Sequence, residues 1–251
     1  MFLPKAAEIL AALRMDGIFS DLRLPDDITS QILAFAQETS CFGNHDRDLD
    51  LTPEEHLARQ SAHNPVTSGH YFERIEECRA AMAVQADSLL NAVAREYLGH
   101  KAKIISTRLW WSFPASMTDA DSKPTTPREM LHFDLDDWRM LKYFFYITPV
   151  DADAGPHLYL KGTHRHHALK HQFSITVGRP MEEVLATYGA DRLSPIHGDA
   201  GSGFAEDPYG YHAGSLARAA PRLMLEIGFG ITPANRRRFF GERVFGKKRL
   251  S

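Results

Sequence analysis

The residue pattern of the chain changes from helical to strand-like at Gly99, and this change limits the folds that the sequence can adopt. Beyond that glycine lie four segments rich in β-branched and aromatic residues, at 103–113, 139–148, 157–160 and 222–229. Turns that contain Asp, Gly and Pro separate them, which is typical of an antiparallel β protein. Helical segments first and strands later predict a β-barrel or sandwich braced by helices.

The first hundred residues are predicted to be mostly helical. Apolar residues recur at helical spacing in three segments, at 4–14, from Pro25 onward and at 71–98. Residues 41–70 are instead polar and rich in His, Asp and Asn, and a short helix is expected to begin there at Pro53. We interpret 41–70 as a long surface loop, a kind of segment that often carries function.

The composition fits one domain over residues 1–251, with helical support up to 100, a β core at 101–230 and a basic tail at 231–251. Hydrophobic residues make up 43% of the chain, enough for a sizeable core.

The net charge of −3 argues against nucleic acid or an anionic membrane as the main partner. No apolar run reaches the roughly 20 residues of a membrane span. The two cysteines, Cys41 and Cys78, lack a CxxC pattern, so we expect a reducing, cytoplasmic setting, with both as buried small residues or exposed thiols.

The sharpest local motif is His132-Phe133-Asp134, in a chain with 13 histidines. Residues two apart in a strand point to the same face, so this imidazole and carboxylate can bind one metal ion. His212 offers a second imidazole in a Gly-rich turn, and Arg222 follows it by ten residues at the start of the last strand. Two histidines and one carboxylate leave three metal positions open, as in non-haem Fe(II) oxygenases. A guanidinium aimed into the same barrel would hold a dicarboxylate in a bidentate way.

With these residues in place, the chain resembles the phytanoyl-CoA dioxygenase-like family of Fe(II)- and 2-oxoglutarate-dependent oxygenases. The resemblance covers residues 100–230 and, weakly, the N-terminal helices. It includes the HxD motif, the distal His and Arg, and two turns, Asp153-Ala-Gly155 and Gly162-Thr-His164. The family more often has Pro where Lys161 stands, which is a difference in a turn and not in the iron site.

The resemblance implies a fold, a chemistry and a role for each residue. The implied fold is a double-stranded β-helix, a cupin-like jelly roll, with helices packed on one sheet. His132, Asp134 and His212 would bind Fe(II), and Arg222 would bind the distal carboxylate of 2-oxoglutarate. Members of the family use O2 to convert 2-oxoglutarate to succinate and CO2 while they oxidise a C–H bond. Halogenating relatives have a small residue at the carboxylate position, so Asp134 favours hydroxylation or another oxidation.

Alternation along the predicted strands separates a core face from a cavity face. The more apolar face should lie under the helices, and the mixed face, which carries Arg222, should line the cavity. The same alternation predicts five further pocket residues: Arg108, Trp110, Lys142, Phe144 and Tyr146. Two cations in a barrel interior need partners, so Arg108 or Lys142 is expected to contact an anionic group of a ligand. The alternative is that Lys142 pairs with Glu226 inside the barrel.

Other residues compete for functional roles, and a structural interpretation is favoured for each. Arg218 lies six residues after His212 and is expected at the surface. Asp136 and Asp137 are expected to be solvated turn carboxylates. Four histidines that could form a second metal site are expected at a solvated helix start: His164, His166, His167 and His171.

The predicted function is an Fe(II)- and 2-oxoglutarate-dependent oxygenase that oxidises a small, biosynthetic molecule. Hydroxylation, desaturation and cyclisation are all open to such a site. The alternatives are a fatty-acyl or acyl-CoA hydroxylase of the same family, and a jelly-roll protein that binds a ligand without turnover. A nucleic-acid oxygenase would use the basic tail 236–249, which we instead expect to be solvated or part of an interface.

Overall fold

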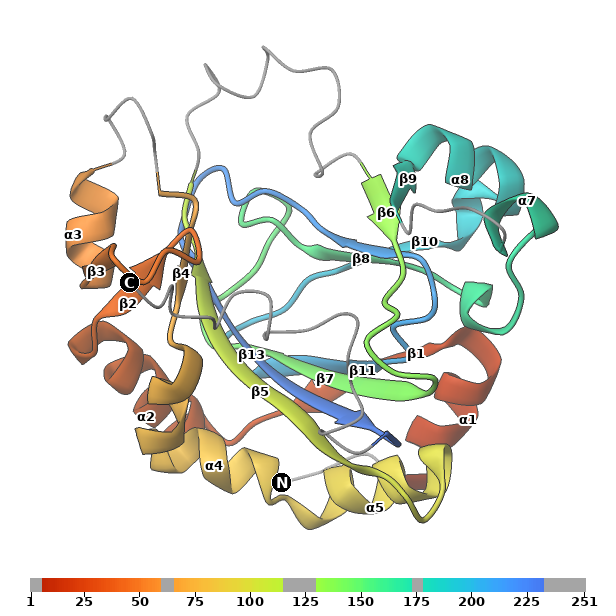
Figure 1. Ribbon diagram of the computed structural model, residues 1–251, viewed down its shortest axis with the longest axis horizontal. Helices are drawn as coiled ribbons and strands as arrows, with labels where there is room; N and C mark the ends of the chain where they lie inside the picture. Colours follow the sequence, from red (N-terminus) through yellow and green to blue (C-terminus); the bar gives the residue numbers. More distant parts are fainter. Residues whose placement is uncertain (1–5, 60–65, 115–129, 173–177, 233–251) are drawn as a thin grey trace, which may run out of the picture.

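Two antiparallel sheets form the core of the computed structural model, which describes residues 6–59, 66–114, 130–172 and 178–232 (Figure 1). Within these residues, the larger sheet has eight strands in the order β1-β11-β7-β13-β5-β4-β2-β3. Its strands are β1 (Ile18–Arg23), β2 (Cys41–Gly43), β3 (Asp50–Leu51), β4 (Ser68–His70), β5 (Lys103–Ser112), β7 (Met140–Tyr146), β11 (Ser202–Glu206) and β13 (Arg222–Gly230). The smaller sheet, in the order β10-β8-β12-β6-β9, consists of β6 (Met130–His132), β8 (His157–Leu160), β9 (Gly178–Pro180), β10 (Leu193–Ile196) and β12 (His212–Gly214). This is the jelly-roll arrangement that the sequence predicts.

The four predicted strands are confirmed as β5, β7, β8 and β13. The strands that the sequence did not predict are short, from two to six residues, as in β3 and β1. A segment of this length shows too few alternations to stand out from a turn. The long strands therefore indicated the fold class, and the short ones complete both sheets.

The helices surround the larger sheet and one end of the smaller one. They are α1 (Ala6–Asp16), α2 (Asp26–Glu38), α3 (Pro53–Ala58), α4 (Arg79–Gln85), α5 (Ser88–Leu98), α7 (Leu169–Gln172) and α8 (Met181–Tyr188), with 3-10 helices η1 (Phe72–Glu77), η3 (Thr163–Arg165) and η4 (Ala190–Arg192). The prediction of one helix over 71–98 is wrong, because η1, α4 and α5 occupy that range. Cys78 has extended backbone angles, and the Asp87 side chain accepts hydrogen bonds from the Leu89 and Leu90 amides, which starts α5 anew.

The prediction of a long surface loop over 41–70 is also wrong in part. β2, β3 and β4 lie in this range and extend the larger sheet beyond β5. The short helix expected at Pro53 is present as α3, and a capping box between Thr52 and Glu55 begins it. Cys41 in β2 is buried, as is Cys78.

Helices α1, α2, α4 and α5 cover the outer face of the larger sheet (Figure 1). The sheet residues beneath them belong to one parity in each strand, and they include Leu109, Trp111, Tyr143, Phe145, Leu225 and Ile227. The opposite parity packs toward the smaller sheet, where Phe144 and Met224 share a cluster with Tyr159. The predicted division between a core face and an inner face is thus found in β5, β7 and β13. No helix in the described residues is long and apolar enough to cross a membrane.

Asp207, at the end of β11, ties the helical layer to the barrel. Its carboxylate accepts a hydrogen bond from the Tyr97 hydroxyl of α5 at 2.8 Å, and its backbone carbonyl accepts one from Tyr159 at 2.9 Å. Burial raises the pKa of Asp207 to about 6. Between pH 3.8 and about pH 6, the Asp207 carboxyl is therefore protonated in the folded protein and ionised in the unfolded chain.

Asp207→Asn should change how stability depends on pH. A raised carboxyl pKa contributes stability that is fully present below pH 3.8 and is lost as the pH rises through about 6. The shift of roughly two units corresponds to about 3 kcal/mol. The free energy of unfolding of the Asn variant, relative to wild type, should therefore rise by roughly 2–3 kcal/mol between pH 4 and pH 7, because part of the effect is already lost at pH 4. Urea unfolding at both pH values measures it, and parallel pH profiles would contradict the expectation.

Candidate metal centre and its cavity

The smaller sheet brings the two histidines of the predicted triad together. His132 ends β6, His212 begins β12, and the two residues are cross-strand partners. Asp134 lies two residues beyond the end of β6, so the expectation that the whole HxD motif sits in a strand is wrong. The Asp134 amide donates a hydrogen bond to the Pro208 carbonyl at 2.8 Å. This bond positions the backbone so that the Asp134 carboxylate lies near the two histidines. One ligand atom from each of the three side chains lies within 4.8 Å of the other two.

The histidines are held in the form that binds a metal. His212 Nδ1 lies 2.9 Å from the Gly210 carbonyl, which can only accept, so Nδ1 carries the proton. The lone pair of His212 is therefore on Nε2, which is 3.7 Å from Asp134 Oδ1. His132 Nε2 is 4.0 Å from the same oxygen. Burial lowers the pKa of both histidines and keeps the imidazoles neutral.

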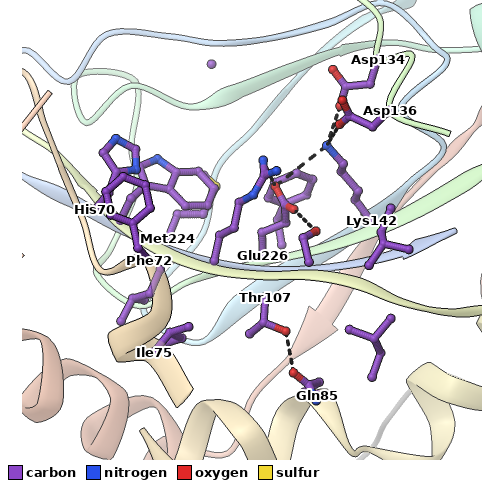
Figure 2. A pocket seen from close by; sticks show the side chains of 18 of the residues that line it. His70, Phe72, Ile75, Gln85, Thr107, Asp134, Asp136, Lys142, Met224 and Glu226 are labelled. Carbon is purple, nitrogen blue, oxygen red and sulfur yellow. Dashed lines mark hydrogen bonds and ion pairs between the residues drawn. The ribbon is translucent and has the colours of Figure 1, made fainter. Parts of the chain in front are cut away.

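Lys142 of β7 holds the other oxygen of the candidate ligand Asp134. Its Nζ lies 2.5 Å from Asp134 Oδ2, 3.8 Å from Asp136 and 4.0 Å from Glu226 (Figure 2). Burial opposes ionisation of Asp134, but the charge and the hydrogen bond of Lys142 hold its pKa well below the usual range. Oδ1 is left facing the two imidazoles. The three donors thus form a neutral-nitrogen and carboxylate set of the kind that Fe(II) prefers.

A cavity of about 970 Å³ lies between the two sheets and contains this cluster. Of the five predicted pocket residues, Arg108, Trp110, Lys142 and Phe144 line it. Tyr146 does not, because its hydroxyl donates to the Ile196 carbonyl and accepts from the His157 amide within the core. The anionic partners of Lys142 are carboxylates of the protein, as in the alternative pairing with Glu226.

Arg222 enters the same cavity from the first residue of β13. The side chain is buried, and its Nη2 donates to Ser112 Oγ at 3.0 Å. Among the described residues, no hydrogen-bond partner faces its Nε or Nη1. A buried guanidinium with two unmatched donors suits a ligand carboxylate. Arg218, its rival, is exposed at the surface and does not line the cavity.

A buried pair that the sequence did not predict stands behind the histidine cluster. His157 Nε2 lies 2.8 Å from Glu206 Oε2, and the His157 ring stacks against His212 with ring centres 5.6 Å apart. Burial lowers the pKa of His157 to about 3, with the charge of Arg222 adding to this, and burial raises that of Glu206 to about 7. His157 was visible as the first residue of a predicted strand. Glu206 lies in β11, which the sequence did not reveal.

The four histidines that were considered for a second metal site do not form one in the described residues. His164, His167 and His171 are buried, so their expected solvation is wrong, whereas His166 is exposed. Within the described ranges, the cluster His132, Asp134 and His212 is the one histidine and carboxylate group with metal-binding spacing.

The two aspartates after the motif are not simply solvated either. Asp136 faces the cavity near Lys142. Asp137 accepts hydrogen bonds from the Ile231 and Thr232 amides, at 2.9 and 2.7 Å, and so fixes the end of β13. The basic tail lies outside the described residues.

Comparison with known proteins adds a fold assignment. No protein-family model and no curated protein matches the sequence. Among solved structures, the chain is similar to the non-haem, α-ketoglutarate-dependent epimerase SnoN from nogalamycin biosynthesis, with a TM-score of 0.61 at 14% identity over 90% of this chain and 82% of SnoN. The chain has the fold of the 2-oxoglutarate-dependent non-haem iron enzymes.

Two further structures agree with this assignment. HygX from Streptomyces hygroscopicus, with nickel and 2-oxoglutarate bound, gives a TM-score of 0.59 at 13% identity, covering 90% of this chain and 87% of HygX. AviO1 from Streptomyces viridochromogenes gives 0.58 at 14% identity, covering 93% and 97%. Identities this low establish the fold, and the chemistry has to be argued from the residues of the site.

Proposed function

We propose that the protein is an Fe(II)- and 2-oxoglutarate-dependent oxygenase that acts on a small molecule. One observation carries the proposal: a neutral His132, a neutral His212 and the Asp134 carboxylate converge in the cavity that also contains the unmatched donors of Arg222. The first three side chains fit an iron ion. The fourth fits the distal carboxylate of 2-oxoglutarate.

Different residues of the chain would orient the metal ligands and exclude water in such a reaction. Bound iron with 2-oxoglutarate and O2 supplies an oxidant for a C–H bond, with release of succinate and CO2. Lys142 orients the Asp134 carboxylate, and the Gly210 carbonyl fixes the ring of His212. Phe144 and Met224 form apolar walls of the cavity and exclude water. Because Asp134 occupies the carboxylate position, oxidation is favoured over halogenation.

The substrate is proposed to be a small biosynthetic molecule. SnoN is described in complex with nogalamycin RO, and HygX with hygromycin B bound. A cavity of about 970 Å³ is large enough for molecules of drug size. An acyl chain hydroxylase of the same family, or a binding protein without turnover, are the alternatives that the experiments below address.

The direct test uses metal and cosubstrate alone. Anaerobic addition of Fe(II) and 2-oxoglutarate should give a visible charge-transfer band. A panel of candidate substrates should then be screened for stimulated succinate formation. A band without any stimulated turnover would favour the binding protein, and no band would contradict the proposal.

Arg222→Ala should raise the Michaelis constant for 2-oxoglutarate about 10- to 100-fold. A charge-assisted pair contributes about 1.5–3 kcal/mol, and each 1.4 kcal/mol is a factor of about ten. Steady-state succinate assays at varied 2-oxoglutarate measure the effect. Arg218→Ala is the matched control, since that arginine is exposed outside the cavity, and it should change little. The reverse pattern would move the cosubstrate anchor to Arg218.

A further inference from the structure

The wall of the cavity formed by β4, β5, η1 and the turn after β2 carries a cluster of rings. We call this set, His45, His70, Phe72 and Trp110, the aromatic platform. All four line the same cavity as the candidate metal cluster. Figure 2 shows His70 and Phe72 at one side of the cavity, with Asp134, Asp136 and Lys142 at the other. His45 and His70 lie in the range 41–70, which was predicted to be a surface loop of a kind that often carries function.

The rings of the platform are mutually ordered. The centres of the His45 and His70 rings lie 3.6 Å apart, and the rings are stacked with an angle of 26°. His70 also stacks with Phe72 at 5.7 Å, and it is the cross-strand partner of Trp110. On the far side, Trp110 meets Phe144 edge to face at 6.4 Å, which connects the platform to the apolar wall beside the metal cluster. The ring contacts therefore connect the turn after β2 to β7 along one wall of the cavity.

The backbone is strained where it presents two of these rings. Among the described residues, the non-glycine residues with positive φ are Asn44, His45 and Phe72, at 50°, 62° and 45°. Such conformations are costly for residues with a Cβ, and they cluster at functional sites. The Asn44 side chain supports this turn by accepting a hydrogen bond from the Thr67 amide at 2.9 Å. The fold thus holds His45 and Phe72 in orientations that an ordinary turn would not give.

Arg47 and Glu73, which also line the cavity, hold the Phe72 ring of the platform in place. The Arg47 guanidinium lies over the Phe72 ring at 4.7 Å, and a two-bond fork to Glu73, at 2.6 and 2.8 Å, holds the guanidinium in place. Burial, and then the neighbouring His45, lower the pKa of His70 to about 3, so its ring is neutral. A rigid set of ring faces loses little conformational entropy when it binds a ligand.

We propose that the aromatic platform binds a ring of the substrate through a flat apolar face, so that the substrate is ring-bearing, aromatic or saccharide, and not an acyl chain. This inference rests on the proposed function for the role of the bound molecule as substrate. Stacked rings with fixed orientation select flat faces, whereas a flexible acyl chain would need a narrow apolar channel. The neighbouring Arg108 and Glu226, which form an ion pair at 3.8 Å, offer polar partners to substituents of that ring.

The test is a titration of metal-free protein followed by NMR. The signals observed are the imidazole protons of His45 and His70 and the indole N–H of Trp110. The first probe is 4-nitrophenyl β-D-glucoside, which contains both kinds of ring, and methyl β-D-glucoside and 4-nitrophenol separate them. Octanoate represents an acyl chain. We expect the two-ring probe to shift all three signals, and the single-ring probes to show which ring stacks.

Two variants test whether the platform makes the contact. Trp110→Leu and Phe72→Leu keep an apolar side chain but remove the ring face, and each should weaken binding of the two-ring probe about two- to tenfold. Trp138→Leu is the matched control, because Trp138 is 91% exposed and does not line the cavity. The iron and 2-oxoglutarate band, measured in each variant, should persist and shows that the metal centre is intact.

The outcomes separate this inference from the proposed function. Absence of the band in wild type would contradict the oxygenase assignment. Binding of a ring-bearing probe to metal-free protein would still support the inference that the aromatic platform binds rings. The platform is wrong if no ring-bearing probe shifts the signals, or if octanoate alone does. It is equally wrong if Trp110→Leu and Phe72→Leu bind the two-ring probe as tightly as Trp138→Leu does.

Discussion

His212→Ala should abolish both the iron-dependent absorption band and succinate formation. His212 Nε2 is a central donor, because it faces Asp134 Oδ1 at 3.7 Å and its ring is fixed by the Gly210 carbonyl. Removal of one of three protein ligands leaves too few donors to retain Fe(II) at ordinary concentrations. His132→Ala should behave in the same way, and Asp134→Ala should lose the band or greatly weaken it. Anaerobic spectroscopy and metal analysis after gel filtration measure the loss.

His197→Ala is the matched control for this experiment. His197 is exposed and lies outside the cavity, so its removal should leave the band and the turnover unchanged. Full iron affinity and turnover in both His132→Ala and His212→Ala would show that the metal centre has been assigned to the wrong residues.

Lys142→Met should destabilise the metal-free protein by about 3 kcal/mol and make it depend on metal for stability. Lys142 is buried between the carboxylates of Asp134 and Glu226, and methionine keeps much of its volume without the charge. Two buried carboxylates then lose their cation, although Arg108 still lies 3.8 Å from Glu226. For a chain of this size the loss corresponds to a fall in Tm of roughly 6–12 °C.

The effect of metal on the Tm shows whether the lost charge or the changed packing destabilises Lys142→Met. A divalent cation supplies the positive charge that Lys142→Met removes, so Ni(II) should raise the Tm of this variant more than that of wild type. Combining Lys142→Met with Glu226→Gln removes one of the two unpaired charges and should restore part of the lost stability. Equal metal-induced shifts in wild type and Lys142→Met, measured by calorimetry, would show that Lys142 acts through packing alone.

The sequence predicted the parts of this protein that a local pattern encodes. β5, β7 and β13 are long enough for alternation to separate an outer face from an inner one, and Arg108 and Lys142 of the predicted inner face line the cavity. The HxD motif named two of the candidate ligands. The same local pattern misjudged the position of Asp134, because a hydrogen bond to the distant Pro208 carbonyl places it.

The parts that were missed depend on pairing between distant strands. The contact of His157 with Glu206 requires β8 and β11 to face each other across the barrel, and β11 is short and was not predicted. The aromatic platform arises because β2 and β4 add to the edge of β5. Nothing in 41–70 alone indicates that pairing, since its polar composition resembles a loop. Register between strands is set by the packing of the whole barrel.

The ion pair between Lys142 and Asp134 joins the two sheets at the candidate metal centre. The histidines belong to the smaller sheet, whereas Lys142 and Arg222 belong to the larger one. The separation between the candidate metal centre and Arg222 is therefore set by the thickness of the layer between the sheets, in which Phe204 and Tyr159 are packed. A change of side-chain volume in that layer, remote from any ligand, alters the span that a dicarboxylate must bridge. In the proposed function, the bulk of the interior thus sets the length of the cosubstrate that fits.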